Sequence, residues 1–368
     1  QLIEMPKIIN GRIDRPGDID VFRFEGRTSE KIVAEVYARR LNSPLDSLLR
    51  LTDAKGNVLA WNDDHMLKES HLHTNIAGLM THHADSYLLT ELPSGGTYYV
   101  HLCDSQNHGG QDHGYRLRIA AAQGDFALRV TPSSLSMRAG GLATLDIHAL
   151  RKDGFDGPIE VFLDDTSAGF ELGGATIPAG CDQVRMTLKA PVKAPDKPVP
   201  LGLAGRARIA GGLVVRSAFA ADDCMQAFLY RHLVPAQQFL VCVQLGRSGM
   251  PAVEVPSEPV RIVAGGSSPW GQARVLVKTR KNPALQQMQL ELLDPPEGLS
   301  LHGVTVVPEG IQFELKADKD AMQNGFAGNL IVEVFRESAP KQQQGKPKPQ
   351  KRRYSLGLLP AIPVQIVQ

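Results

Sequence analysis

The sequence is poor in the features that mark a membrane span, a nucleic-acid binder or a disulfide scaffold. It contains no run of about 18 apolar residues, which excludes a transmembrane helix. Its 40 lysines and arginines balance 39 aspartates and glutamates, so no surplus charge favours nucleic acid or an anionic membrane. The four cysteines form no CxxC pair, and we expect buried thiols, with one disulfide as the open alternative.

The familiar catalytic motifs are missing as well. HExxH, GxSxG, the P-loop pattern and GxGxxG do not occur. HHADS, residues 82–86, contains His, Asp and Ser, but neighbours on an extended chain point apart and do not converge into a triad. The sequence therefore predicts a protein that is not an enzyme, with no catalytic residue.

What the sequence does contain is alternation with period two, interrupted by glycine (35) and proline (25). In KIVAEVYARR, residues 31–40, the side chains of Ile32, Ala34 and Val36 share one face. TYYVHLCD and GYRLRIA alternate in the same way, as half-buried antiparallel strands do. In DSLLRLTDAKGNVLAWNDD, residues 46–64, Gly56 and Asp53 predict a hairpin turn between two strands.

These patterns predict an all-β fold of tandem β-sandwiches. Strand-like segments recur every ten to twenty residues after residue 125, a spacing that resembles immunoglobulin-like sandwiches. We expect a jelly-roll-like sandwich over 1–122, an Ig-like sandwich over 123–250 and a second Ig-like sandwich over 251–368. The basic, Gln-rich and Pro-rich segment 339–353 is predicted to be a mobile loop.

Four stretches together resemble the bacterial pre-peptidase C-terminal (PPC) domain: NGRIDRPGDIDVFRF (10–24), DSLLRLTDAKGNVLAWNDD (46–64), LPSGGTYYVHL (92–102) and GYRLRI (114–119). The resemblance covers the first third of the chain. It implies a non-catalytic, jelly-roll-like β-sandwich of a secreted protein. In its pattern of short strand-like segments, the rest of the chain resembles Ig-like modules of bacterial cell-envelope proteins. Some PPC domains bind calcium through acidic residues before the first strand; here that leader, QLIEMPK, has Glu4 as its only acid, which argues against this route.

A cluster of oxygen-bearing side chains ends the hairpin. Asn62, Asp63 and Asp64 could ligate a hard cation such as calcium if the fold brings Asp18 and Asp20 close. The alternative, which we favour, is that these residues cap turns through backbone hydrogen bonds.

Eight of the 11 histidines lie between residues 65 and 113, namely His65, His71, His73, His82, His83, His101, His108 and His113. His71 and His73 have a usable zinc-ligand spacing, and Asp85 follows nearby. No motif positions a second ligand pair, so a solvated polar loop is the favoured interpretation. Zinc is a weaker alternative than calcium, and a metal-dependent hydrolase is the least favoured function.

The function predicted first is a non-catalytic module of an exported bacterial protein, acting as an accessory, spacer or interaction region. Its expected partners are other domains of the same or neighbouring envelope proteins. The second is a binding module for an extracellular polymer, polysaccharide or collagen-like, with Tyr37, Tyr99 and Trp61 as ligand surface. The N-terminus lacks the basic start and apolar stretch of a signal peptide, which leaves a cytosolic chain or a removed leader as alternatives; the motifs favour a secreted, periplasmic or cell-surface location.

Overall fold

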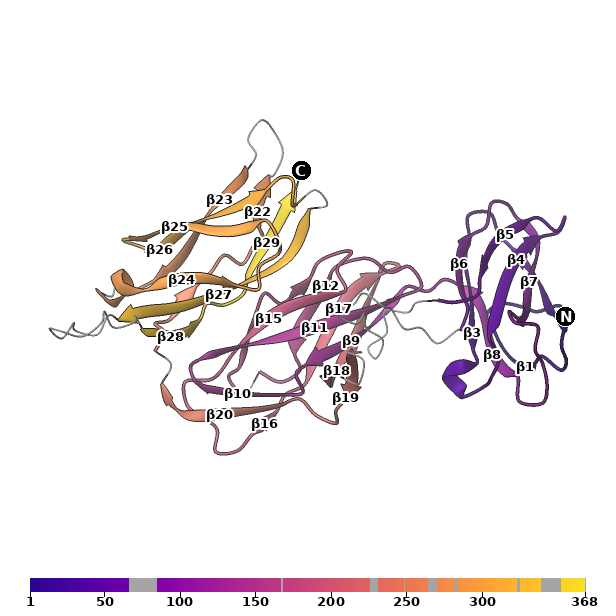
Figure 1. Ribbon diagram of the computed structural model, residues 1–368, viewed down its shortest axis with the longest axis horizontal. Helices are drawn as coiled ribbons and strands as arrows, with labels where there is room; N and C mark the ends of the chain where they lie inside the picture. Colours follow the sequence, from indigo (N-terminus) through magenta and orange to yellow (C-terminus); the bar gives the residue numbers. More distant parts are fainter. Residues whose placement is uncertain are drawn as a thin grey trace, which may run out of the picture. The chain divides into compact units, whose positions relative to one another are not determined.

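The computed structural model describes residues 1–65, 85–166, 168–225, 231–247, 249–263, 270–280, 283–322, 325–338 and 352–367. These residues form strands and two short 3-10 helices, η1 (Arg39–Leu41) and η3 (Pro283–Gln287), and no α-helix occurs among them. The strands build tandem β-sandwiches, which confirms the predicted fold class (Figure 1). No helix in the described ranges has the length and apolar character needed to cross a bilayer.

The chain divides into two compact units. The first consists of Gln1–Phe126, Leu150–Phe155 and Cys224–Leu233. The second consists of Ala127–Ala149, Asp156–Asp223 and Val234–Gln368. The short segment Leu150–Phe155, which begins in the last three residues of strand β11 (Leu142–Lys152), thus packs with the first unit and contributes to the site described below.

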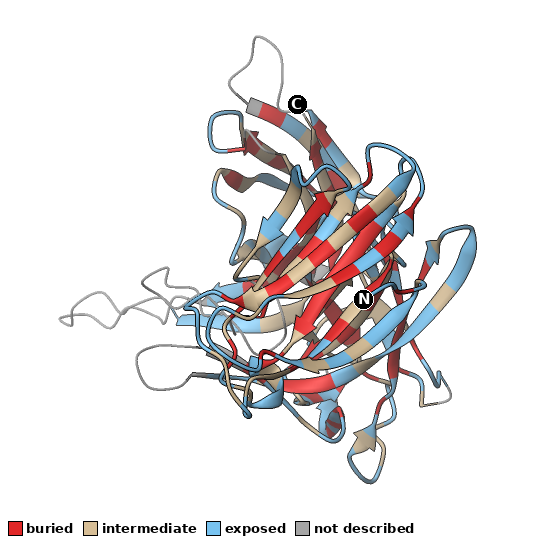
Figure 2. Ribbon diagram, turned by 90° about the vertical axis from the view of Figure 1, so that its right-hand side faces the viewer, coloured by how far each residue is buried: buried red, intermediate tan, exposed pale blue. Residues whose placement is uncertain are grey.

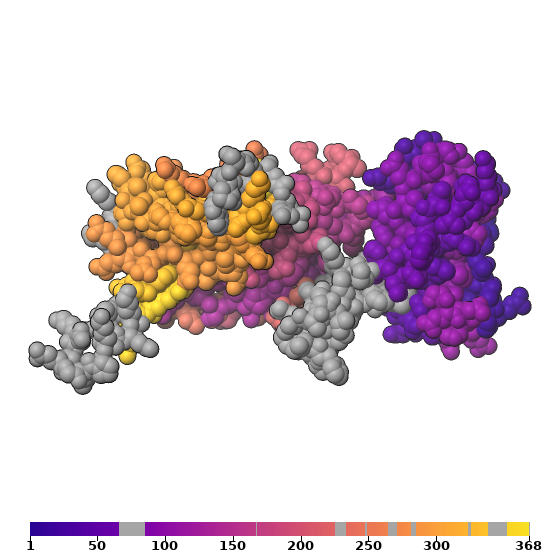
Figure 3. Space-filling model, turned by 45° about the horizontal axis from the view of Figure 1, so that its top comes forward, coloured from indigo at the N-terminus to yellow at the C-terminus, as the bar shows by residue number. Residues whose placement is uncertain are grey.

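Two four-stranded antiparallel sheets form the first sandwich. One sheet has the order β1 (Lys7–Arg12), β8 (Gly114–Ala121), β3 (Lys31–Tyr37) and β6 (Tyr87–Glu91). The other has the order β2 (Asp20–Gly26), β7 (Gly96–Asp104), β4 (Ser47–Asp53) and β5 (Val58–Asn62). In the space-filling view this sandwich is the part coloured indigo to purple (Figure 3).

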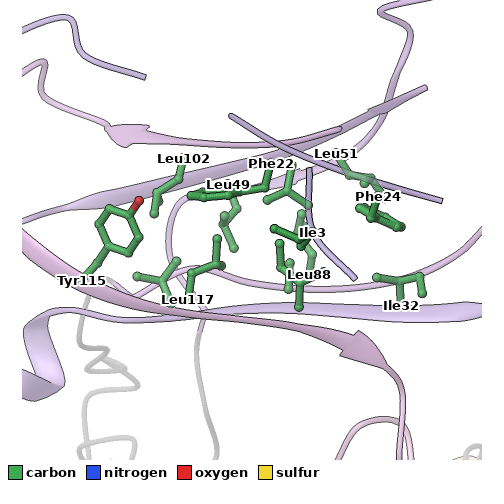
Figure 4. Close-up of a cluster of buried hydrophobic side chains, with 14 of the residues drawn as sticks. Ile3, Phe22, Phe24, Ile32, Leu49, Leu51, Leu88, Leu102, Tyr115 and Leu117 are labelled. Atoms are coloured by element: carbon green, nitrogen blue, oxygen red, sulfur yellow. The ribbon is translucent and has the colours of Figure 1, made fainter. Parts of the chain in front are cut away.

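The core of the first sandwich lies between these sheets and follows from the alternation of the strands. Phe22, Leu49 and Leu102 face inward from one sheet and meet Leu88 and Leu117 of the other (Figure 4). All five are less than 7% exposed. Because residues on a strand alternate between its faces, the buried and exposed positions appear as bands along each strand in Figure 2.

The predicted hairpin is present between β4 and β5. Gly56 has a positive φ of 84°, a backbone conformation that side-chain-bearing residues rarely adopt. The Asp53 carboxylate accepts hydrogen bonds from the backbone N–H groups of Lys55 and Asn57, both at 2.8 Å. The turn chemistry inferred from the sequence is therefore confirmed.

The next sandwich pairs a nine-stranded sheet with a three-stranded one. The large sheet contains β9 (Asp125–Thr131), β11 (Leu142–Lys152), β12 (Ile159–Leu163), β13 (Glu171–Gly173), β14 (Thr176–Ile177), β15 (Gln183–Lys189), β17 (Leu203–Ile209), β18 (Gly212–Met225) and β19 (Arg231–Pro235). The small sheet contains β10 (Ser134–Ala139), β16 (Val199–Pro200) and β20 (Leu240–Arg247). Parallel pairing joins β10 to β20 and β9 to β18.

The last sandwich pairs a four-stranded sheet with a five-stranded one. The former contains β21 (Val253–Glu254), β23 (Trp270–Thr279), β25 (Leu299–Val307) and β26 (Gly310–Asp318). The latter contains β22 (Val260–Val263), β24 (Gln289–Leu293), β27 (Phe326–Ser338), β28 (Arg352–Leu358) and β29 (Ile362–Val367). Of the predicted mobile loop 339–353, residues 339–351 lie outside the described residues, and 352–353 begin β28.

Side-chain hydrogen bonds connect the last two sandwiches within the second unit. Asn329 of β27 donates from Nδ2 to the backbone carbonyl oxygens of Gly174 (2.8 Å) and Arg185 (2.9 Å). The Thr187 hydroxyl of β15, which is fully buried, accepts the backbone N–H of Ala361 at 2.9 Å. These bonds satisfy backbone groups across the contact between β15 and β27.

Cys103, Cys224 and Cys242 are free thiols, and the Cys181 thiol donates a hydrogen bond to the carbonyl oxygen of Ala327 at 3.3 Å. Cys103 and Cys181 are half-buried, whereas Cys224 and Cys242 are exposed. The prediction of buried thiols is therefore wrong for the last two. Cys242 lies on β20 between Val241 and Val243, which face the core, so the alternation of the strand turns its thiol outward.

Candidate functional site

The Asn62-Asp63-Asp64 cluster binds the backbone at the end of β5. The Asn62 side chain accepts the backbone N–H of Tyr87 on Oδ1 (2.9 Å) and donates from Nδ2 to the carbonyl oxygen of Asp64 (3.0 Å). The Asp63 carboxylate accepts the backbone N–H of Asp64 at 3.0 Å. Asn62 thereby connects β5 to the first residue of β6, in the opposite sheet. These contacts are those of a turn cap.

Asp18 and Asp20 serve a different turn. The Asp18 carboxylate accepts the backbone N–H of Asp14 at 2.9 Å. Asp20, at the start of β2, accepts a hydrogen bond from the hydroxyl of Tyr115 in the opposite sheet. Burial, followed by this contact with Asp20, raises the pKa of Tyr115 far above its ordinary value, so the phenol remains a donor.

Strand register separates the two groups of predicted cation ligands. Asp20 pairs with Leu102, Leu102 with Leu49, and Leu49 with Asn62, in one row across the sheet. Asp20 and Asn62 are therefore on opposite edge strands, about 14 Å apart at the backbone, because neighbouring strands lie about 4.8 Å apart. Calcium needs its oxygen ligands within about 2.6 Å. The sheet does not bring these two positions together, and the calcium site stays a prediction.

Among the residues that the structure describes, no group of three or more His, Cys, Asp or Glu side chains is arranged to hold a metal ion. His71, His73, His82 and His83 of the predicted zinc alternative lie outside the described residues. His101 contacts the Thr52 hydroxyl through Nε2 at 3.1 Å, and burial followed by the charge of Arg50 lowers its pKa.

Asp85, the acid nearest to those histidines, caps η1. Its carboxylate is fully buried and accepts the backbone N–H groups of Ala38 (3.0 Å) and Arg39 (2.7 Å). It also accepts Nε of Arg40 at 2.8 Å. The described hydrogen-bond donors to the Asp85 carboxylate are therefore backbone and arginine groups of the protein.

The three aromatic residues predicted as ligand surface do not form one strip. Trp61, on the edge strand β5, is 63% exposed and pairs with Arg50. Tyr99, on β7 of the same sheet, is half-buried and points to the same outer side. Tyr37 belongs to β3 of the other sheet, where the Arg40 guanidinium lies 3.8 Å from the centre of its ring. The structure thus keeps Trp61 and Tyr99 on one face and places Tyr37 elsewhere.

Tyr37 instead lines a hollow of about 510 Å³ in the first unit that the sequence did not reveal. We call it the Arg118 hollow. It is lined by aromatic, charged and amide side chains, including Tyr37, Tyr87, His65, Glu35, Arg118, Gln123 and Asp153. The imidazole of His65 stacks on the ring of Tyr87, with 4.5 Å between their centres.

Arg118 of β8 bridges two carboxylates at this hollow. It donates to Glu35 on β3 from Nε (3.1 Å) and Nη2 (2.9 Å). It donates to both carboxylate oxygens of Asp153, each at 2.8 Å. Both acids are largely buried, and the Tyr87 hydroxyl adds a bond to Asp153 at 3.3 Å. Arg40 adds a second cation, since its Nη1 donates to Glu35 at 3.2 Å, so two guanidinium groups compensate the two carboxylates.

The pKa values of Asp153 and Tyr87 in this network are shifted further from neutral pH. Burial opposes ionisation of Asp153, but the hydrogen bonds and charge of Arg118 outweigh it and lower the pKa below its ordinary value of 3.8. Burial, then the charge of Asp153, raises the pKa of Tyr87 well above its ordinary value. At neutral pH Asp153 is ionised and Tyr87 is protonated. The hollow therefore offers hydrogen bonds and charged groups. Neither Asp153 nor Tyr87 changes its protonation state near neutral pH.

The sequence indicates only one part of this network, the pair of Glu35 and Arg118. Glu35 and Arg118 are cross-strand partners on β3 and β8, where opposite charges pair favourably. Asp153 comes from a segment 35 residues further along the chain, and no pattern in the sequence connects it with β8.

We compared the chain with known proteins. A scan against protein-family models gave no match. The chain is 35% identical over 89 residues to a probable subtilase-type serine protease of Deinococcus radiodurans, an alignment that covers 24% of the chain and spans only 10% of that protease. Among solved structures, it matches the pre-peptidase C-terminal domain of a collagenase from Bacillus anthracis. There the sequence identity is 17%, the match covers 32% of this chain and 91% of that domain, and the TM-score is 0.22. The predicted PPC resemblance is confirmed. We refer to the first sandwich as the PPC-like sandwich.

Proposed function

We propose that this chain is a non-catalytic accessory region of an exported bacterial protein, a series of β-sandwiches that spaces or presents other domains. The observation that carries the proposal is the Arg118 network: the carboxylates Glu35 and Asp153 at the Arg118 hollow both accept hydrogen bonds from one guanidinium. A general acid or base needs a pKa near the working pH, and Asp153 is held far from it.

The comparisons support the exported setting of this proposal. One relative is a probable subtilase-type serine protease, and the matched solved structure is the pre-peptidase C-terminal domain of a collagenase. We place the chain outside the cytoplasm, secreted, periplasmic or at the cell surface, with other envelope domains as partners. We also propose the domain ranges 1–122, 123–250 and 251–368, the last two with Ig-like topology.

Two measurements on one tagged strain test the proposal. The full-length gene product, expressed at native level in its own bacterium, is expected in the envelope or culture-fluid fraction. Purified chain is expected to release no peptide from casein or gelatin. Recovery from the soluble cytoplasm with reduced thiols contradicts the exported location. Peptide release that disappears in the Glu35→Gln variant contradicts the non-catalytic role.

Trp61 favours a second candidate function, binding of an extracellular polymer. Its indole is 63% exposed on an edge strand, beside Arg50 and on the same outer face as Tyr99. Large aromatic side chains supply most of the energy of a binding surface when they are exposed in the unbound protein.

Co-sedimentation with insoluble cellulose, chitin and collagen fibrils tests this second function. Retention on one polymer should fall by about fivefold or more in Trp61→Ala, the loss expected for one aromatic anchor. Val58→Ala is the matched control, because Val58 is 51% exposed on the same strand. Equal retention of the two variants, or no retention of the native chain, removes the hypothesis.

A further inference from the structure

A second hollow lies in the second unit, on the sandwich that follows the PPC-like one. Its volume is about 290 Å³, and we call it the Phe219 hollow. Phe219 of β18 lines it with 61% of its surface exposed, and Phe239, 4% exposed, lies beneath. Four polar side chains complete the lining: Asp164, Ser217, Gln237 and Gln238.

These four polar side chains are available to a ligand. All four residues are exposed, and within the described ranges their side chains make no hydrogen bond to the protein. A carboxylate accepts hydrogen bonds, whereas a hydroxyl and two primary amides both donate and accept. Polar groups placed around an apolar surface are the usual make-up of a small-molecule site.

The backbone holds Asp164 at the rim of the hollow. The N–H of Asp164 donates to the carbonyl oxygen of Gly202 at 2.9 Å. A Cβ on Gly202 would lie 2.6 Å from Oδ2 of Asp164, so the carboxylate in its present position occupies the space that the glycine leaves open. The backbone bond thus places Asp164 at the hollow, with its carboxylate beside Gly202.

The two charges near the ring have opposite signs, so together they favour neither a net anion nor a net cation. The Asp164 carboxylate repels an anion. The Arg129 guanidinium carbon lies 5.4 Å from the centre of the Phe219 ring, where it repels a cation. What fits is a neutral ligand with one flat apolar face for the ring and several hydroxyl groups for the carboxylate and amides. The volume lies at the low end for ligand pockets, about 300 Å³, and suits one or two sugar rings.

We propose that the Phe219 hollow is a binding subsite for a neutral saccharide. Phe219 stacks on the apolar face of a pyranose ring. Asp164, Gln237 and Gln238 accept from and donate to its hydroxyl groups. The site is separate from the Arg118 hollow and from the Trp61 face, and it does not depend on the accessory role proposed above.

Calorimetric titration of the full chain with cellohexaose, chitohexaose and mannohexaose tests the proposal. At least one is expected to bind with a Kd of about 1 mM or tighter, and Phe219→Ala should weaken that binding by about tenfold. Asp164→Ala should weaken it as well. Leu213→Ala is the matched control, because Leu213 is 62% exposed on the same side of β18 but outside the hollow. Leu213→Ala should bind as the native chain does.

Three outcomes would overturn the inference. One is that none of the three hexasaccharides binds at about 10 mM, well above the Kd expected of a weak site. Another is that Phe219→Ala binds as tightly as the native chain. The third is that a lysine-rich peptide binds in a Phe219-dependent manner while the saccharides do not. Circular dichroism of each variant confirms that the fold is retained, as expected for exposed side chains.

Discussion

At the scale of single residues, Arg118 is the side chain on which the polar interior of the PPC-like sandwich depends. It is 28% exposed and holds Glu35 and Asp153, two carboxylates that are more deeply buried than itself. A buried ion pair adds little net stability over apolar packing, but removing one partner leaves the other charge buried without compensation. The network is therefore most sensitive at its shared cation.

Arg118→Met removes that cation and should destabilise β3 and β8 by about 2–4 kcal/mol, somewhat less than for a fully buried pair. Amide hydrogen exchange of β3 and β8 peptides in the full chain measures this change as an opening free energy. Arg116→Met is the control, because Arg116 lies on the same strand and its side chain bonds only exposed Asn10. Similar exchange in the two variants would contradict a structural role for the network.

The network also predicts a pH dependence. Because Arg118 lowers the pKa of folded Asp153 below 3.8, the ionised carboxylate stabilises the folded state above that pH. This contribution is lost as pH falls through the lowered pKa. The stability difference between native chain and Asp153→Asn should therefore be constant from pH 5 to 7 and shrink below about pH 4. Urea titrations at each pH measure it, and a difference that grows on acidification would refute the assignment.

The role of a residue could be predicted from the sequence only where its hydrogen-bond partners are close to it along the chain. The Asp53 and Gly56 turn could be predicted because its partners are within four residues. The sequence favoured a capping role for Asn62, but it did not identify the partner Tyr87, which belongs to the opposite sheet. Asp153 escaped prediction altogether, since the contact depends on how a distant segment packs against β8.

At the scale of elements, the period-two alternation of apolar residues determines which face of each strand is buried. Every inward residue of KIVAEVYARR named from the alternation is at most 2% exposed. The alternation predicts faces but no register between strands. It therefore could not show that Asp20 and Asn62 lie on opposite edges of one sheet.

One strand carries an element-scale prediction. Asn329 of β27 donates to two backbone carbonyls of the neighbouring sandwich, so Asn329→Ala should cost about 1–3 kcal/mol by removing both hydrogen bonds. Thermal unfolding of the full chain, followed by far-UV circular dichroism, measures the loss. Gln289→Ala, an exposed amide of the same sheet, should have little effect. An equally mild result for Asn329 would show that these bonds contribute little.

At the scale of the whole molecule, the last two sandwiches belong to one compact unit. Asn329 and Thr187 contribute hydrogen bonds on both sides of the contact between β15 and β27. We infer that the two sandwiches open together, because separating them breaks the hydrogen bonds that Asn329 and Thr187 make to backbone groups of the other sandwich.

Leu330→Ala tests this cooperativity. Leu330 is 2% exposed in the core of the last sandwich, and its truncation should cost about 2–5 kcal/mol. If the sandwiches open together, amide exchange should rise in β15 as well as in β27. A rise confined to β24, β27 and β29 would mean that the last sandwich opens alone.

The exposed indole of Trp61 has a practical consequence for studying this protein in solution. The chain has two tryptophans, and this one already meets water in the folded state. Its fluorescence will therefore change little when the PPC-like sandwich melts, and a fluorescence melt would miss that event. The same indole becomes a sensitive optical probe for anything that lands on the outer face of β5, since a bound molecule would remove it from water.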